Sequence, residues 1–148
     1  MKNLLTIGFV VVFTLLFTFS AFADDQSVKG TDEIQQKYLK NVVLNQEMLV
    51  QAVGMFKQGI DTQNQSEIEF YSRLAKNIIS EDIRLTATKA TIDNSAETAT
   101  LLKSKKQLLK NISDEANNHL ELRYRFMTRY ITLLNDEADS YRVKVASK

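Results

Sequence analysis

The sequence contains no cysteine, no proline and no tryptophan, and only 4 glycines among its 148 residues. Without cysteine the chain can form no disulfide, and it offers neither a thiol nucleophile nor a cysteine that could be acylated. Because proline and glycine are the strongest helix breakers, their scarcity favours long helices over strands and tight turns. The fold must therefore rely on a helical core, and the length suits one domain.

Residues 1–23 have the layout of a secretory signal peptide. Lys2 provides a basic start, residues 4–19 are predominantly apolar, and residues 21–23 read Ala-Phe-Ala, which is an A-x-A type of cleavage site. We expect cleavage after this site and export to the periplasm or the extracellular space. The alternative is an uncleaved anchor in the inner membrane, because residues 4–23 are just long enough to span a bilayer.

The charge of the chain is balanced. It has 19 basic and 18 acidic residues, and removal of Lys2 with the leader leaves a formally neutral protein. A neutral chain gives no general attraction toward nucleic acid or an anionic membrane. We therefore expect no nucleic-acid partner and, after cleavage, no integral membrane span.

Beyond a flexible lead-in at residues 24–30, apolar residues recur with helical spacing, which predicts one helical-bundle domain over residues 31–148. A first helix is expected from Thr31 until just after Gly59, where the polar segment DTQNQ follows. Ser66, followed three residues later by Glu69, forms a capping box that predicts the start of a second helix.

Polar residues could interrupt the helices at two places further along the chain. Asp93-Asn94-Ser95 is the first, and Asn94 with Glu97 repeats the capping pattern there. Residues 96–145 then form either one very long helix or two helices separated near 113–118, where Ser, Asp and two Asn cluster. The predicted fold is an all-α antiparallel bundle of three or four amphipathic helices.

The single histidine, His119, is the first candidate for a chemical site. On a helix it would share a face with Glu115, so these two are weak candidates for metal ligands. A di-iron bundle would need an acid at position 116, where the chain has Ala116. Met48 and Met55 raise the alternative of haem held between His and Met, but methionines at helical spacing usually fill a core. The favoured interpretation is a structural His119 on the inward apolar stripe beside Glu115, with no cofactor.

An enzyme is not expected. No serine lies in a glycine-rich elbow, and no glycine-rich loop could hold a phosphate. The chain has acidic doublets at 81–82, 114–115 and 136–137. The two side chains of each doublet would point about 100° apart on a helix, so no doublet can place its carboxylates on opposite sides of one bond. Such doublets usually mark solvated faces, and the basic residues at 103–110 are interpreted in the same way.

A second face of the last helical segment is the better candidate for function. It comprises Glu121, Tyr124, Arg125 and Arg129. Arginine and tyrosine are typical of protein interfaces, and Glu121 lies four residues before Arg125. These residues are predicted to bind a protein partner.

The leading hypothesis is therefore an exported helical bundle that binds a protein, as an envelope accessory, chaperone-like or inhibitor module. A homo-oligomer formed through helix packing is compatible with it. One alternative is a metal- or haem-binding bundle that uses His119. Another is a membrane-anchored helical stalk or sensor fragment, if residues 4–23 are retained.

Overall fold

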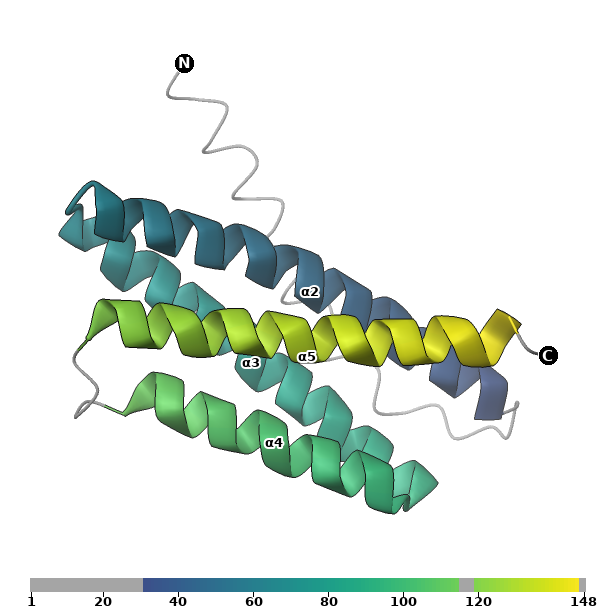
Figure 1. Cartoon of the computed structure of the whole chain (residues 1–148). Helices are drawn as coiled ribbons and strands as arrows, with labels where there is room; N and C mark the ends of the chain where they lie inside the picture. The colour runs from purple at the N-terminus through teal and green to yellow at the C-terminus, as the bar shows by residue number, and fades with distance from the viewer. Residues whose placement is uncertain (1–30, 115–118, 147–148) are drawn as a thin grey trace. The chain divides into compact units, whose positions relative to one another are not determined.

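The computed structural model describes residues 31–114 and 119–146, and these residues contain helices and turns but no strand. The chain divides into two compact groups of residues, Met1–Thr31 and Asp32–Lys148, and the helices from Asp32 onward lie in the second group. Figure 1 shows the four helices, which are α2 (Thr31–Asp61), α3 (Gln65–Asp93), α4 (Ala96–Ser113) and α5 (Leu120–Ala146). The predicted all-α bundle is confirmed. The signal peptide expected at 1–23 and the lead-in at 24–30 lie outside the described residues.

The helices of this second group run antiparallel to their neighbours. Tyr38, near the start of α2, donates a hydrogen bond to Glu137, near the end of α5. Lys57, near the end of α2, forms an ion pair with Glu121 in the first turn of α5. The short turns between α2 and α3 and between α3 and α4 reverse the chain in the same way (Figure 1).

The start of α3 differs from the prediction. Asn64, and not Ser66, is the N-cap: its side-chain oxygen accepts a hydrogen bond from the backbone N–H of Glu67 at 3.3 Å. Asparagine caps a helix N-terminus as well as serine does, so a capping pattern alone does not distinguish between two candidates that lie two residues apart. The expected capping box from Ser66 to Glu69 is therefore wrong by two residues.

The break between α3 and α4 lies where it was predicted, but Asn94 and Ser95 have different roles from those expected. Asn94 ends α3 in the left-handed conformation, with φ of 47°, and its N–H donates to the carbonyl of Ala90. Ser95 caps α4, because its hydroxyl accepts a hydrogen bond from the N–H of Thr98 at 3.1 Å. Asparagine tolerates the left-handed region better than most residues, which suits it to a helix C-terminus.

The long C-terminal segment forms two helices, so the alternative of one continuous helix is wrong. α4 ends at Ser113 and α5 begins at Leu120. Asp114 follows α4 in an extended conformation, with φ of −67° and ψ of 115°, so the helix does not continue past Ser113.

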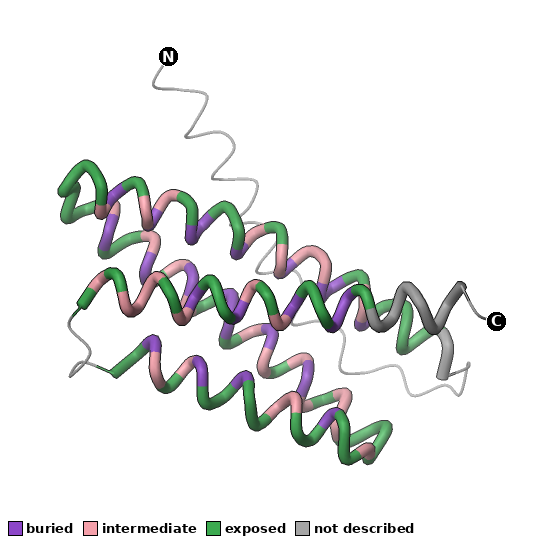
Figure 2. The backbone as a smooth tube through the Cα atoms, in the orientation of Figure 1, coloured by how far each residue is buried: buried purple, intermediate pink, exposed green. Residues whose placement is uncertain are grey.

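Each helix buries one stripe of side chains, and Figure 2 shows these buried stripes along the helices. The apolar core contains the following fully buried residues: Val42, Leu49, Phe56, Ala75, Ile78, Ile79, Ile112, Met127, Tyr130 and Leu134. Ile34 is 47% exposed, because it lies in the first turn of α2 at the end of the bundle. Ile92, in the last turn of α3 at the same end of the bundle, is also exposed.

Gly59 allows the end of α2 to approach the start of α3. A Cβ atom at this position would lie 3.1 Å from the backbone nitrogen of Ile68 and 3.1 Å from the Cβ of Glu67. Gly54, one and a half turns earlier on α2, has no atom within 4 Å of the corresponding position. The chain therefore needs a glycine at 59 for close packing but not at 54.

Candidate functional site: a buried ionic cluster and the outer face of α5

A lysine at the centre of the bundle organises a cluster of buried polar groups. Lys105 of α4 is fully buried, and its Nζ lies 2.7 Å from Asp82 Oδ2 of α3 and 2.7 Å from Glu137 Oε2 of α5. The same nitrogen donates a hydrogen bond of 2.8 Å to Thr86 Oγ1. An ammonium group has three N–H donors, so every donor of Lys105 has an acceptor.

Two buried tyrosines donate hydrogen bonds to these carboxylates. Tyr130 donates a hydrogen bond of 2.7 Å to Asp82 Oδ2, and Tyr38 donates one to Glu137 Oε1. Burial raises the pKa of both tyrosines, and the nearby carboxylates raise the pKa values further. Both hydroxyls therefore stay protonated and act only as donors to the carboxylates. We call Tyr38, Asp82, Thr86, Lys105, Tyr130 and Glu137 the buried ionic cluster.

All four helices contribute to this cluster, in which two carboxyl groups contact one ammonium group. Burying ions costs several kcal/mol each, and the cost is offset only when partners and hydrogen bonds are complete. They are complete for Lys105, but the buried Asp82 Oδ1 has no hydrogen-bond partner.

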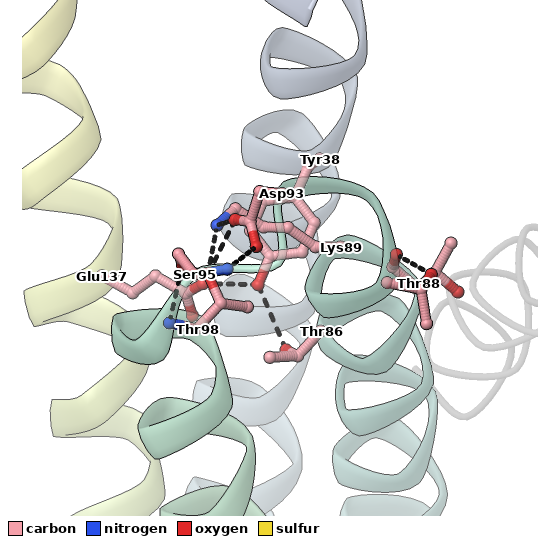
Figure 3. A network of polar contacts seen from close by, with 9 residues as sticks. Tyr38, Thr86, Thr88, Lys89, Asp93, Ser95, Thr98 and Glu137 are labelled. Atoms are coloured by element: carbon pink, nitrogen blue, oxygen red, sulfur yellow. Dashed lines mark hydrogen bonds and ion pairs between the residues drawn. The ribbon is translucent and has the colours of Figure 1, made fainter.

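A second polar network lies beside the cluster, at the turn between α3 and α4 (Figure 3). Asp93 forms an ion pair with Lys89 and accepts hydrogen bonds from the backbone N–H of Ser95 and the hydroxyl of Thr98. Burial acts to raise the pKa of Asp93, but these hydrogen bonds outweigh it and lower the pKa to about 2. The Nζ of Lys89 also lies 5.4 Å from the ring centre of Tyr38, which joins the network to the cluster.

Sequence reasoning missed the cluster. The doublets 81–82 and 136–137 were interpreted as solvated, yet Asp82 and Glu137 are the buried members of these pairs. Lys105 was likewise grouped with the surface lysines of α4, although it is fully buried. The positions of Asp82 and Lys105 in the helical repeat could have indicated their burial. Asp82 lies three residues after Ile79, and Lys105 lies three residues before Leu108, so each shares a helix face with an apolar residue.

The structure does not place His119 on the inward stripe. His119 is exposed and precedes α5, where its carbonyl accepts hydrogen bonds from the N–H groups of Leu122 and Arg123. The interpretation of His119 as an inward-facing structural residue is therefore wrong, because α5 begins one residue after it. Glu115 and Ala116 lie outside the described residues. In residues 31–114 and 119–146, no group of three or more His, Cys, Asp or Glu side chains is placed to hold a metal ion.

The four residues predicted to bind a partner occupy α5, but they divide into two pairs. Arg125 and Arg129 are exposed one turn apart on the outer side of the helix. Glu121 and Tyr124 face α2 instead: Lys57 Nζ lies 3.1 Å from Glu121 Oε1 and 5.8 Å from the ring centre of Tyr124. Tyr124 is half-buried against the core. We call Glu121, Tyr124, Arg125 and Arg129 the α5 face.

Within the part of the chain that the structure describes, none of the helices has both the length and the apolar character needed to cross a membrane. Comparison of the chain with protein families, with curated proteins and with solved structures found no match.

Proposed function

We propose that this chain is an exported helical-bundle protein that acts by binding another protein through the α5 face. The observation that carries the proposal is the exposure of Arg125 and Arg129 one turn apart, beside the half-buried Tyr124. Arginine and tyrosine supply much of the binding energy at protein interfaces, and a side chain that is already ordered loses less entropy on binding.

Lys57 supports this proposal because it orders one edge of the α5 face. Its contacts with Glu121 and Tyr124 restrain both side chains from α2. The ion pair contributes little to stability, because both of its side chains are partly exposed. The contacts of Lys57 instead hold Tyr124 in one position beside the two arginines.

The export part of the proposal rests on residues 1–23, with their basic start, apolar run and Ala-Phe-Ala ending. The test is the mass of the protein recovered from its native compartment. The expected mature chain begins at Asp24, and a recovered form that still carries residues 1–23 would contradict cleavage.

The binding part is tested by affinity capture from the exported fraction with the double variant Arg125→Glu/Arg129→Glu. Reversing two exposed charges should abolish capture of the specific partner without unfolding the bundle. The matched control is Lys103→Glu/Lys106→Glu, which makes the same charge change at two exposed positions of α4. Loss of the partner in the α5 variant alone supports the proposal, whereas equal capture by both variants contradicts it.

A further inference from the structure

The exposed side of α5 changes charge along its length. Arg125 and Arg129 are exposed in the N-terminal half of the helix. Asp136 and Asp139 are exposed in the C-terminal half, and Thr132 is exposed between the two pairs. These residues follow one another at intervals of four, three, four and three positions, so they form one line along the helix. We call these five residues the charged stripe of α5.

The charged stripe is complementary to a second copy of itself in the antiparallel orientation. If Thr132 lies against the partner's Thr132, Arg129 comes opposite the partner's Asp136, since these residues lie three positions before and four positions after Thr132. The mismatch of one residue is about 1.5 Å along the helix, which a long arginine side chain can span. Arg125 and Asp139 lie seven positions from Thr132 on opposite sides, so they are also brought together.

Symmetry favours this orientation over a parallel one. In the antiparallel arrangement a two-fold axis passes beside Thr132, and each pair of opposite charges occurs twice. A parallel arrangement would place Arg129 against the partner's Arg129 and Asp136 against the partner's Asp136. Like charges that meet across an interface are unfavourable, so the distribution of charge along α5 selects the antiparallel orientation.

The centre of the charged stripe suits close contact between two helices. Thr132 has a small side chain, and its hydroxyl donates a hydrogen bond to the carbonyl of Thr128 within the same helix. Ile131 and Leu133 flank Thr132 and are only partly buried against the core. A second helix laid over Thr132 would cover part of their remaining apolar surface, which adds a favourable contribution to the ion pairs.

We propose that the partner of the α5 face is a second copy of this chain, which binds antiparallel through the charged stripe. The inference rests on the proposed function, because it names the partner of the same face. Exposed ion pairs each contribute little free energy, so the charges set the orientation and register of the two copies. The apolar surface beside Thr132 supplies the remaining attraction.

The test is sedimentation equilibrium of the purified chain and of two single variants, with circular dichroism to check folding. Arg129→Glu sets two acids against each other in both symmetric pairs, and Asp136→Arg sets two arginines against each other. Each change should weaken self-association by about tenfold or more. The control Lys103→Glu/Lys106→Glu alters two exposed positions of α4 and should associate as the wild type does.

Mixing the two single variants distinguishes the antiparallel interface from any other. In the mixture the new acid of one variant lies opposite the new base of the other, and the native pair remains at the second position. We therefore expect a dimer with one copy of each variant. The double variant Arg129→Glu/Asp136→Arg should also recover self-association, because it exchanges the charges within every pair.

Two results would overturn the second copy as the partner. One is a wild-type chain that stays monomeric, and the other is a mixture that associates no better than each variant alone. If the wild type is monomeric while affinity capture with Arg125→Glu/Arg129→Glu still loses a different protein, the proposed function stands and this inference fails. Self-association that is equally strong in both single variants and the wild type would place the contact on another face and would also contradict the inference.

Discussion

The two ends of the bundle are built from different chemistry. At the end that contains the α2–α3 turn, the large buried side chains are apolar, among them Phe56, Ile112 and Met127. Nearer the other end, the core contains the buried ionic cluster around Lys105. Apolar contacts are non-directional, so many side chains of suitable volume satisfy them. The ion pairs and hydrogen bonds of Lys105 instead require particular partners on α3 and α5.

The two ends therefore differ in how strictly they constrain the packing of the helices. Four amphipathic helices of similar pattern could pack in several registers through their apolar stripes alone. The contacts of Lys105 with Asp82, Thr86 and Glu137 form together in the observed register. Sliding one helix along another would break them, because these contacts need short distances. A buried polar group that selects one register is a recognised role of such residues in helical assemblies.

The largest expected effect comes from replacing Lys105 with methionine, which has similar volume but no charge. Lys105→Met removes the buried ammonium that contacts both carboxylates, and it should lower the free energy of unfolding at pH 7 by about 3–5 kcal/mol. The apolar counterpart, Met127→Leu, keeps volume and should cost less than about 1.5 kcal/mol. Urea unfolding of both variants measures the difference, and equal losses would show that the two ends do not differ.

The next effect concerns the close approach at the apolar end. Gly59→Ala places a methyl group 3.1 Å from the backbone nitrogen of Ile68, so we expect a loss of about 1–3 kcal/mol from overpacking. Gly54→Ala adds the same methyl group in open space and should stabilise the protein by about 0.5–1 kcal/mol, because alanine favours a helix. Thermal unfolding should move in opposite directions for the two variants, and a shift in the same direction would contradict the packing described at Gly59.

The smallest effect lies in the network beside the cluster. The pKa of Asp93 is lowered from 3.8 to about 2, so the folded state favours its ionised form. This contribution is fully present above pH 3.8 and is lost as the pH falls toward 2. Because the Asp93 side chain is 27% exposed, we expect Asp93→Asn to cost only about 1 kcal/mol at pH 7 after allowance for solvent screening.

The measurement for Asp93 is the difference in urea unfolding between wild type and Asp93→Asn as a function of pH. The difference should shrink as the pH falls from 4 toward 2. The Asp136→Asn variant, which removes a charge at an exposed position, serves as the control for the loss of one carboxylate. A difference for Asp93→Asn that stays constant down to pH 2 would exclude the ionised network.

Helical periodicity predicted the all-α class, the antiparallel bundle and the interruption near Asn94, because apolar residues at 3.6-residue spacing must face a common core. Periodicity could not locate each helix end, since Asn64 and Ser66 are both good caps. It also could not decide between one helix and two after residue 96, where the outcome depended on a short polar segment.

The buried ionic cluster escaped prediction for a different reason. Charged residues are almost never fully buried unless they are paired, so the usual expectation for Lys105, Asp82 and Glu137 is a solvated face. The two ion pairs join residues 23 and 32 positions apart in the sequence, and they become visible only when three helices are brought together. For His119 the error was smaller, since the start of α5 lies one residue beyond it.

The most direct test of the account is the NMR signal of the Lys105 ammonium group. With all three N–H donors buried and bonded to Asp82, Thr86 and Glu137, its protons should exchange slowly with water and show contacts to Thr86 and Tyr130. The ammonium protons of the exposed Lys106 should be lost to rapid exchange under the same conditions. Exchange at Lys105 as rapid as at Lys106 would contradict the presence of a buried ionic cluster in this bundle.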